Sequence, residues 1–335
     1  MRLLITGGAG FIGSNLVHSL LPKTEIEKLV VLDSLTYAGH KLSLEGAQEF
    51  SKYSFSKVDL TERELVYKLI KTEKITHVIH LAAESHVDRS ISGPSAFVET
   101  NVMGTFNLLE ASREFWATEW SGCRFLHVST DEVFGSLGKT GAFSETSPYQ
   151  PNSPYSASKA GADHLVRAYY HTYNFPAIIT NCSNNYGPFQ FPEKLIPQTI
   201  HRAASNKPIP VYGDGSNVRD WLYVKDHVEA LWLALTQGVP GESYNVGGDN
   251  EWSNLRLVKT ICGLVDRRLN NSTGTARKLI TFVNDRPGHD LRYAIDADKI
   301  RRELRWKPAH DFEPAIELTV DWYLSNRDWV ESVMS

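Results

Sequence analysis

A short glycine-rich segment near the start of the chain constrains its fold more than any other feature. Residues 6–13 read Thr-Gly-Gly-Ala-Gly-Phe-Ile-Gly, which places glycine at positions 7, 10 and 13. The segment follows an apolar run over 2–6 that predicts a strand, and it opens a stretch over 11–21 with helical apolar spacing. Glycine allows a tight turn and a close approach of the backbone to a diphosphate, and the amides of the following helix face that anion. The spacing therefore predicts a βαβ unit that binds a dinucleotide; an ordinary glycine-rich turn is the alternative.

An acidic residue at the end of the second predicted strand supports the dinucleotide interpretation. Asp33 follows a buried run over 29–32 and lies about 20 residues after Gly13, the usual place for such an acid. A carboxylate there binds the ribose hydroxyls and repels a 2′-phosphate, and no arginine lies between Asp33 and Lys41. The sequence therefore favours NAD over NADP. Asp59 ends the next predicted strand and either reaches the adenine or caps the following helix.

Strands and helices alternate strictly through the first half of the chain. The predicted strands of this half span residues 2–6, 29–32, 53–58, 76–82, 124–129 and 177–181. The predicted helices span residues 11–21, 61–73, 96–115 and 155–173. This alternation predicts an α/β fold with a Rossmann-type doubly wound parallel sheet over residues 1–182. Ligands bind such sheets at the carboxyl ends of the strands, where the polar residues of this half gather.

After about residue 182 the pattern loosens into a mixture of short elements. Strands are predicted over residues 209–212, 221–224, 243–246 and 280–283, and helices over 195–205, 226–236, 255–265 and 312–325. We expect a smaller α+β C-terminal lobe over 183–335 that binds the substrate. The boundary is soft, because strands and helices can cross between the lobes.

Composition excludes several classes of partner. Lys and Arg number 35 against 39 Asp and Glu, a formal net charge of −4, so no basic excess predicts a nucleic-acid partner. The three cysteines (Cys123, Cys182 and Cys262) are widely spaced, so we expect free thiols in a reducing cytoplasm and no metal site. The uncharged stretch over 3–22 is too rich in glycine for a signal peptide or a membrane helix, so we expect no membrane association.

Two further motifs carry groups suited to acid–base chemistry. Tyr155 and Lys159 are four residues apart, so on a helix they share a face, and the lysine charge would stabilise a tyrosine phenolate. Such pairs also occur on solvated faces. Thr130, Asp131 and Glu132 follow the predicted strand over 124–129, where neighbouring carboxyls push their pKa values apart and can serve as acid and base. A surface turn is the alternative.

Arginines in the second half are candidates for phosphate binding. Arg219 lies in Asn217–Asp220 and Arg286 in Asp285–Asp290, and a guanidinium binds phosphate oxygens in pairs. A salt bridge at the rim of the lobe is an equally good interpretation of either residue.

Together, the glycine motif and Tyr-x-x-x-Lys resemble the extended short-chain dehydrogenase/reductases that act on nucleotide sugars. Within that branch, the segments Ala83–Ser90, Ser129–Val133, Asn184–Pro188 and Asp285–Asp290 resemble those of the dTDP-glucose 4,6-dehydratases. The resemblance covers nearly the whole chain, and Thr-Asp-Glu is its most discriminating element.

The resemblance implies an NAD-dependent lyase that removes water from a nucleotide sugar. Tyr155 would take the proton of the 4-hydroxyl with support from Lys159, Thr130 would bind the C4 oxygen, Glu132 would remove the C5 proton, and Asp131 would protonate the leaving hydroxyl. It also implies a homodimer joined through the helices near 96–115 and 155–173. A UDP-sugar C4 epimerase or decarboxylase of the same family and a catalytically silent NAD-binding sensor remain as alternatives, and the choice between dTDP and UDP stays open.

The resemblance further implies contact residues at two subsites. Those implied for NAD are Gly7, Gly10, Phe11, Ile12, Gly13, Asp33, Ser34, Leu35, Thr36, Asp59, Leu60, Leu81, Ala82, Ala83, Ser85, Thr100, Tyr155, Lys159 and Asn185. Those implied for the nucleotide sugar are Ser85, Thr130, Asn184, Lys194, Leu195, Pro210, Val211, Tyr212, Arg219, Asn254, Asp285, Arg286, His289 and Asp290.

Overall fold

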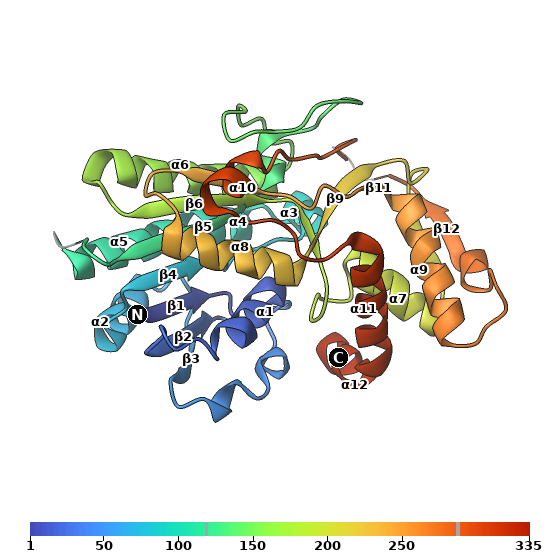
Figure 1. Ribbon diagram of the computed structural model, residues 1–335, viewed down its shortest axis with the longest axis horizontal. Coiled ribbons are helices and arrows are strands. Elements are labelled where there is room, and N and C mark those ends of the chain that lie inside the picture. Colours follow the sequence, from blue (N-terminus) through green and yellow to red (C-terminus); the bar gives the residue numbers. More distant parts are fainter. Residues whose placement is uncertain (118–119, 286–288) are drawn as a thin grey trace.

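A seven-stranded parallel sheet forms the larger lobe of the computed structural model, which describes residues 1–117, 120–285 and 289–335 (Figure 1). In spatial order its strands are β10 (Ser243–Val246), β6 (Ala177–Cys182), β5 (Arg124–Thr130), β4 (His77–His80), β1 (Arg2–Thr6), β2 (Lys28–Asp33) and β3 (Tyr53–Lys57). The strand order reverses at β1, which pairs with β2 on one side and β4 on the other. Ligands bind at such a switch point in doubly wound sheets, and the predicted Rossmann-type fold is confirmed.

Alternate residues of the central strands pack into two separate cores, one on each face of the sheet. Leu3 and Ile5 belong to the core shared with helices α1 (Phe11–Leu20) and α8 (Val224–Gln237). Leu4, between them, belongs to the opposite core. That face is covered by three helices, α2 (Arg63–Glu73), α5 (Thr105–Trp116) and α6 (Pro154–Tyr173) (Figure 1). Burial on both faces explains why these strands are nearly continuous apolar runs.

The long helix predicted over 96–115 is not uniform in the structure. A short turn α4 (Ser95–Phe97) leads into a π-helical segment η3 (Val98–Gly104), which continues as α5. Within η3 the Asn101 side chain accepts a hydrogen bond from Glu84 N (2.8 Å) and donates to Glu84 O (3.0 Å). These contacts come from a loop 17 residues away, so helical periodicity could not reveal them. Single π turns of this kind occur frequently at functional sites.

A smaller lobe follows residue 182 and has its own apolar core. It contains a three-stranded sheet of β11 (Glu251–Ser253), β9 (Val218–Tyr223) and β7 (Asn184–Tyr186), and a parallel pair of β12 (Ile280–Val283) with β8 (Ile209–Tyr212). Its helices are α7 (Leu195–Ala204), α9 (Asn254–Arg268), α11 (Phe312–Ser325) and α12 (Arg327–Met334) (Figure 1). Shorter helical elements of the chain are α3 (Val87–Ser92), η1 (Lys41–Leu44), η2 (Ala47–Glu49), η4 (Asp131–Phe134), η5 (Ala276–Leu279) and α10 (Asp298–Leu304).

Some segments beyond residue 182 belong to the large sheet. Strand β10 pairs in parallel with β6, and Tyr244 and Val246 of this strand are fully buried. Helix α8 packs against β5 and β6. Strand β10 thereby pairs with an apolar edge of β6 that would otherwise be exposed, and α8 covers one face of the sheet. In the described part of the chain, no helix has the length and apolar character needed to cross a membrane.

Candidate active site

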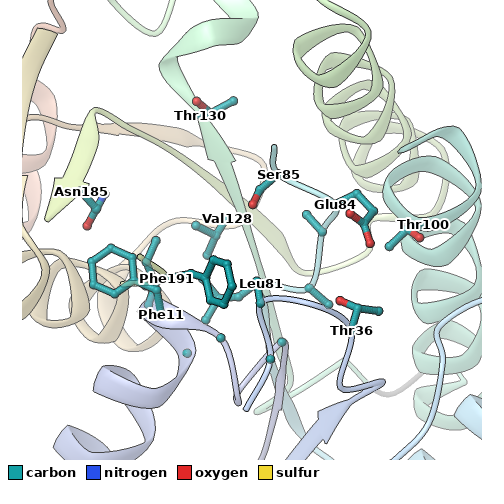
Figure 2. A pocket seen from close by; sticks show the side chains of 18 of the residues that line it. Phe11, Thr36, Leu81, Glu84, Ser85, Thr100, Val128, Thr130, Asn185 and Phe191 are labelled. Carbon is teal, nitrogen blue, oxygen red and sulfur yellow. The ribbon is translucent and has the colours of Figure 1, made fainter. Parts of the chain in front are cut away.

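Six strands of the large sheet direct their carboxyl ends toward one cavity of about 330 Å³. These are β1, β2, β3, β4, β5 and β6, and the loops that follow them supply much of the lining. The smaller lobe contributes Asn184, Asn185 and Lys194. Figure 2 shows side chains from both lobes around this space, among them Phe11, Thr100 and Asn185.

The glycine motif forms a tight cradle at the bottom of the cavity. Gly7 has φ +70°, and a Cβ on it would lie 2.7 Å from Ala82 N. A Cβ on Gly13 would lie 2.1 Å from Gly7 O. Gly10 is the N-cap residue of α1, and the close packing at Gly7 and Gly13 brings the free amides at the start of that helix to the cavity. The cradle therefore fits a diphosphate held by backbone groups.

Asp33 is fixed at the end of β2 beside this cradle. Its Oδ2 accepts a hydrogen bond from Ala9 N (2.9 Å), and its Oδ1 accepts one from Leu35 N (2.8 Å). Burial raises the pKa of this carboxyl, and the two amide hydrogen bonds oppose that rise. Asp59 also lines the cavity. It does not cap α2, which begins only at Arg63; its Oδ1 instead accepts hydrogen bonds from the backbone amide and the hydroxyl of Thr61.

Two adjacent carboxyls follow β5 and have different surroundings. Asp131 is 2% exposed, and its Oδ2 has no hydrogen-bond partner among the described residues. Burial, then the charges of Glu132 and Asp220, raise the pKa of Asp131 well above its usual value. Glu132 is only partly buried. The Thr130 hydroxyl donates to Asp131 Oδ1 and accepts from Glu132 N, both at 3.3 Å, and so holds the turn in place. Asp131 is therefore suited to donate a proton, with a second carboxyl beside it.

Tyr155 and Lys159 lie on one face of α6, at its first two turns. The helix begins with a capping box between Ser153 and Ser156, which fixes the first turn. Lys159 is buried and donates to Val128 O at 2.8 Å. Burial and the charge of Glu132 raise the pKa of Tyr155 well above its usual value. A phenolate there therefore needs positive charge beside it, and Lys159 is placed to supply it.

The arrangement agrees with what comparison with known proteins shows. The family described as GDP-mannose 4,6 dehydratase matches residues 4–319. The chain belongs to this family. It is 54% identical over 336 residues to a dTDP-glucose 4,6-dehydratase of Xanthomonas campestris, covering 99% of this chain and 95% of that one. It is 52% identical over 342 residues to another of Neisseria meningitidis, covering 100% and 96%.

Solved structures of family members and of related enzymes have the same fold. The structure of a dTDP-glucose 4,6-dehydratase from Bacillus anthracis in complex with NAD is 44% identical, with a TM-score of 0.89 and 99% of both chains covered. A UDP-glucose 4-epimerase from Thermus thermophilus in complex with NAD is 30% identical, with a TM-score of 0.86 and coverage of 97% and 100%. The fold is thus shared by a dehydratase and an epimerase, so the residues in the cavity must separate the two activities.

Most residues predicted for the cofactor subsite line the cavity of this family member. Leu35 is the exception: its amide donates to Asp33, and it lies outside the lining. All of the predicted catalytic residues, Thr130, Asp131, Glu132, Tyr155 and Lys159, line the cavity. So do four of those predicted for the substrate, namely Ser85, Thr130, Asn184 and Lys194.

The other predicted substrate residues that the structure describes lie in the smaller lobe, outside the lining of this cavity. His289 Nδ1 is 2.6 Å from Asp285 Oδ1, and its ring lies against Tyr212. Arg219 donates to Asp290 O at 3.0 Å and stacks over Tyr293. Pro210, Val211 and Tyr212 are on β8, Leu195 begins α7 and Asn254 begins α9. Arg286 lies outside the described residues.

The sequence did not single out Tyr37, Phe191 and Glu193, which also line the cavity. Tyr37 lies against Phe191 in an edge-on contact, and the Arg89 guanidinium lies 3.7 Å over the Tyr37 ring. Glu193 Oε2 lies 3.3 Å from Arg89 Nη2 and 3.5 Å from His86 Nε2. These contacts join loops of both lobes that are far apart in sequence, so no local sequence pattern predicts them.

Proposed function

We propose that this protein is an NAD-dependent dTDP-glucose 4,6-dehydratase. It is a hydro-lyase that converts dTDP-glucose into dTDP-4-keto-6-deoxyglucose and water. The observation that carries the proposal is the pair Asp131 and Glu132, which shares one cavity with Tyr155 and Lys159. An elimination across two neighbouring carbons needs a base and an acid together, and this pair supplies both. The activity of relatives at 54% and 52% identity supports the assignment.

The cradle and its neighbours fit NAD as the resident cofactor. The close backbone packing at Gly7 and Gly13 places the start of α1 at the cavity, where its amides can hold the diphosphate, and Asp33 is placed for the ribose hydroxyls while it repels a 2′-phosphate. When bound there, NAD would supply the hydride acceptor for C4 of the sugar and, in its reduced form, the hydride donor for C6. Because the cofactor ends each turnover as it began, the protein needs no external oxidant.

The residues of the cavity divide the proton transfers among themselves. Tyr155 takes the proton of the 4-hydroxyl, with Thr130 holding the C4 oxygen. The resulting ketone acidifies the C5 proton, which Glu132 removes. Asp131, kept protonated by burial, gives its proton to the C6 hydroxyl, which leaves as water. A proton returned at C5 completes the 6-deoxy product.

A mass measurement tests the proposal. Purified protein is incubated with dTDP-glucose and no added NAD, alongside UDP-glucose. We expect a product lighter by one water from dTDP-glucose, and a weaker reaction or none from UDP-glucose. Failure to convert dTDP-glucose, with the fold intact and the cofactor bound, would reject the proposal.

The competing functions make different predictions in the same experiment. A UDP-sugar C4 epimerase would leave the substrate mass unchanged and would not need Asp131 as an acid. A silent NAD-binding sensor would hold cofactor and convert neither sugar. The burial of Asp131 with its raised pKa favours the dehydratase over both, since neither alternative uses a protonated acid at that place.

We also propose a homodimer and a cytoplasmic location. Apolar side chains, Val98 and Met103, are about half exposed on η3, the segment that packs against α6. Pairing of this face in two copies would cover them. The three cysteines are free and buried, which fits a reducing compartment. Light scattering tests the first point, where a monomer would contradict it, and fractionation of cells tests the second.

A further inference from the structure

A buried carboxylate that takes no part in the steps above lies one helical turn beyond Lys159. Asp163 has 0% exposure and shares the face of α6 that carries Tyr155 and Lys159. Its Oδ2 accepts hydrogen bonds from Ser129 Oγ and Tyr149 OH, both at 2.8 Å. A carboxylate is almost never buried this completely without a charged partner.

The charges that face Lys159 identify this partner. Lys159 is 4% exposed; burial lowers its pKa, and the charge of Asp163 opposes the decrease. Although burial alone would raise it, the pKa of Asp163 is lowered by His127, Lys159 and Ser129. Asp163 Oδ1 lies 3.1 Å from His127 Nε2. Asp163 is therefore ionised and can neutralise the buried ammonium group.

Other titratable groups around Lys159 are neutral. Burial and the charge of Lys159 lower the pKa of His127 on β5, and burial lowers that of His80 on β4. Burial raises the pKa of Cys182, at the end of β6, to about 12. Asp131 and Glu132 act on Tyr155 from the turn after β5. In the described part of the chain, Asp163 is thus the ionised carboxylate whose charge acts on Lys159.

We propose that Asp163 is a positioning residue that keeps Lys159 positively charged, so that Tyr155 can act as the base. The inference rests on the proposed function in its assignment of that base. The carboxylate cannot turn away, because two hydroxyls hold its Oδ2. Tyr149 is itself held by Arg167 Nη2 (3.1 Å), which also donates to Ser243 on β10 (3.2 Å). The charge is therefore anchored to the sheet as well as to the helix.

The direction in which the pKa of Tyr155 changes on substitution of Asp163 tests the proposal. In the Asp163→Asn variant, loss of the counter-charge should leave Lys159 neutral near pH 7, so the pKa of Tyr155 should rise by about one to three units. If Lys159 instead kept its charge, removal of a negative group would lower that pKa. The readout is the near-ultraviolet phenolate absorbance of the NAD-loaded protein, minus that of the same background carrying Tyr155→Phe. If the midpoint of the Tyr155 titration in Asp163→Asn is unchanged or lower, the proposal is overturned.

A matched control separates the charge of Asp163 from its hydrogen bonds. Tyr149→Phe removes one hydrogen bond to Asp163 Oδ2 and keeps the carboxylate. Its Tyr155 midpoint should equal that of the unaltered protein, whereas a shift as large as that of Asp163→Asn would show that packing is responsible. The acid limb of the pH–rate profile should follow the titration in each variant.

A stability cycle covers the case in which Asp163→Asn folds poorly. Lys159→Met, Asp163→Asn and the double variant are compared by thermal unfolding with NAD bound. Lys159→Met leaves the Asp163 carboxylate alone in the interior, and Asp163→Asn leaves Lys159 without its counter-charge, so the double variant should unfold at a higher temperature than the sum of the single losses predicts. Additive losses overturn the proposal. Neither the phenolate titration nor the unfolding cycle uses the sugar, so failure to convert dTDP-glucose would reject the proposed function without deciding this inference.

Discussion

The Asp131→Asn substitution isolates the acid of the proposed elimination. Asparagine has nearly the same volume and keeps an acceptor for the Thr130 hydroxyl, which donates to Asp131 Oδ1 at 3.3 Å. The Oδ2 atom that becomes an amide has no hydrogen-bond partner among the described residues, so no contact of the fold is lost. Because burial raises the pKa of Asp131 and so favours its protonated form, the substitution removes a proton donor. We therefore expect an intact protein that binds NAD normally.

The loss of rate follows from the role of a positioned acid. General acid catalysis typically contributes a factor of about 10² to 10⁴, which is about 3 to 5 kcal/mol of the activation barrier. Dehydration of dTDP-glucose should fall by that factor. Oxidation at C4 needs Tyr155 and not Asp131, so NADH absorbance should appear and persist after substrate is mixed with the NAD-loaded variant. The assay follows the dehydrated product by mass and NADH by absorbance in the same samples.

Two outcomes would refute this reasoning. Unchanged dehydration would show that another group protonates the leaving hydroxyl. Loss of the NADH signal together with the product would show that Asp131 acts before elimination. Asp214→Asn is the matched control, because Asp214 is exposed on a turn of the smaller lobe and lies outside the cavity; it should retain the full rate.

Further predictions concern the base, the cradle, the pH profile and the mouth of the cavity. Glu132→Gln should stop elimination and leave C4 oxidation possible, so NADH should accumulate; an unaffected overall rate would remove Glu132 from the mechanism. Gly13→Ala would place a Cβ 2.1 Å from Gly7 O, so the purified protein should contain no NAD and should unfold at a lower temperature; full NAD content would contradict the cradle. Since Asp131 works protonated and its pKa is raised, dehydration should decline as pH rises through that pKa, whereas a rate still rising there would contradict the assignment. Glu193→Gln removes an ion pair whose arginine is about half exposed, so release of NAD during dialysis should speed up by at most about fivefold, and a far larger effect would mean that Glu193 contacts the cofactor.

Features that depend on a few neighbouring residues could be predicted from the sequence. The run Arg2–Thr6 predicts a strand because every second residue enters one of two cores, and the structure has that strand with the same bounds. The glycine cradle follows from the absence of side chains at three spaced positions. Both depend on the local backbone, so a few neighbouring residues of the sequence are enough to predict them.

Features that depend on distant contacts could not be predicted in this way. The π-helical segment η3 is accompanied by the bonds of Asn101 to the Glu84 backbone, which helical periodicity does not reveal. Asp163 reads as an ordinary polar residue of α6 until β5 and the loop before the helix bring Ser129 and Tyr149 to it. The position of β10 beside β6 also could not be predicted, because it depends on how the whole sheet is assembled.

The unequal roles of Asp131 and Glu132 come from packing and not from their chemistry. As free side chains these two carboxyls would titrate within about half a unit of each other. The turn η4 that carries them follows the last residue of β5, and successive residues of a 3₁₀ turn point about a third of a revolution apart. One side chain is thereby directed into the interior near Asp220 and the other stays partly open. Any change that exposed Asp131 would therefore lower its raised pKa and remove the proton donor that the elimination requires.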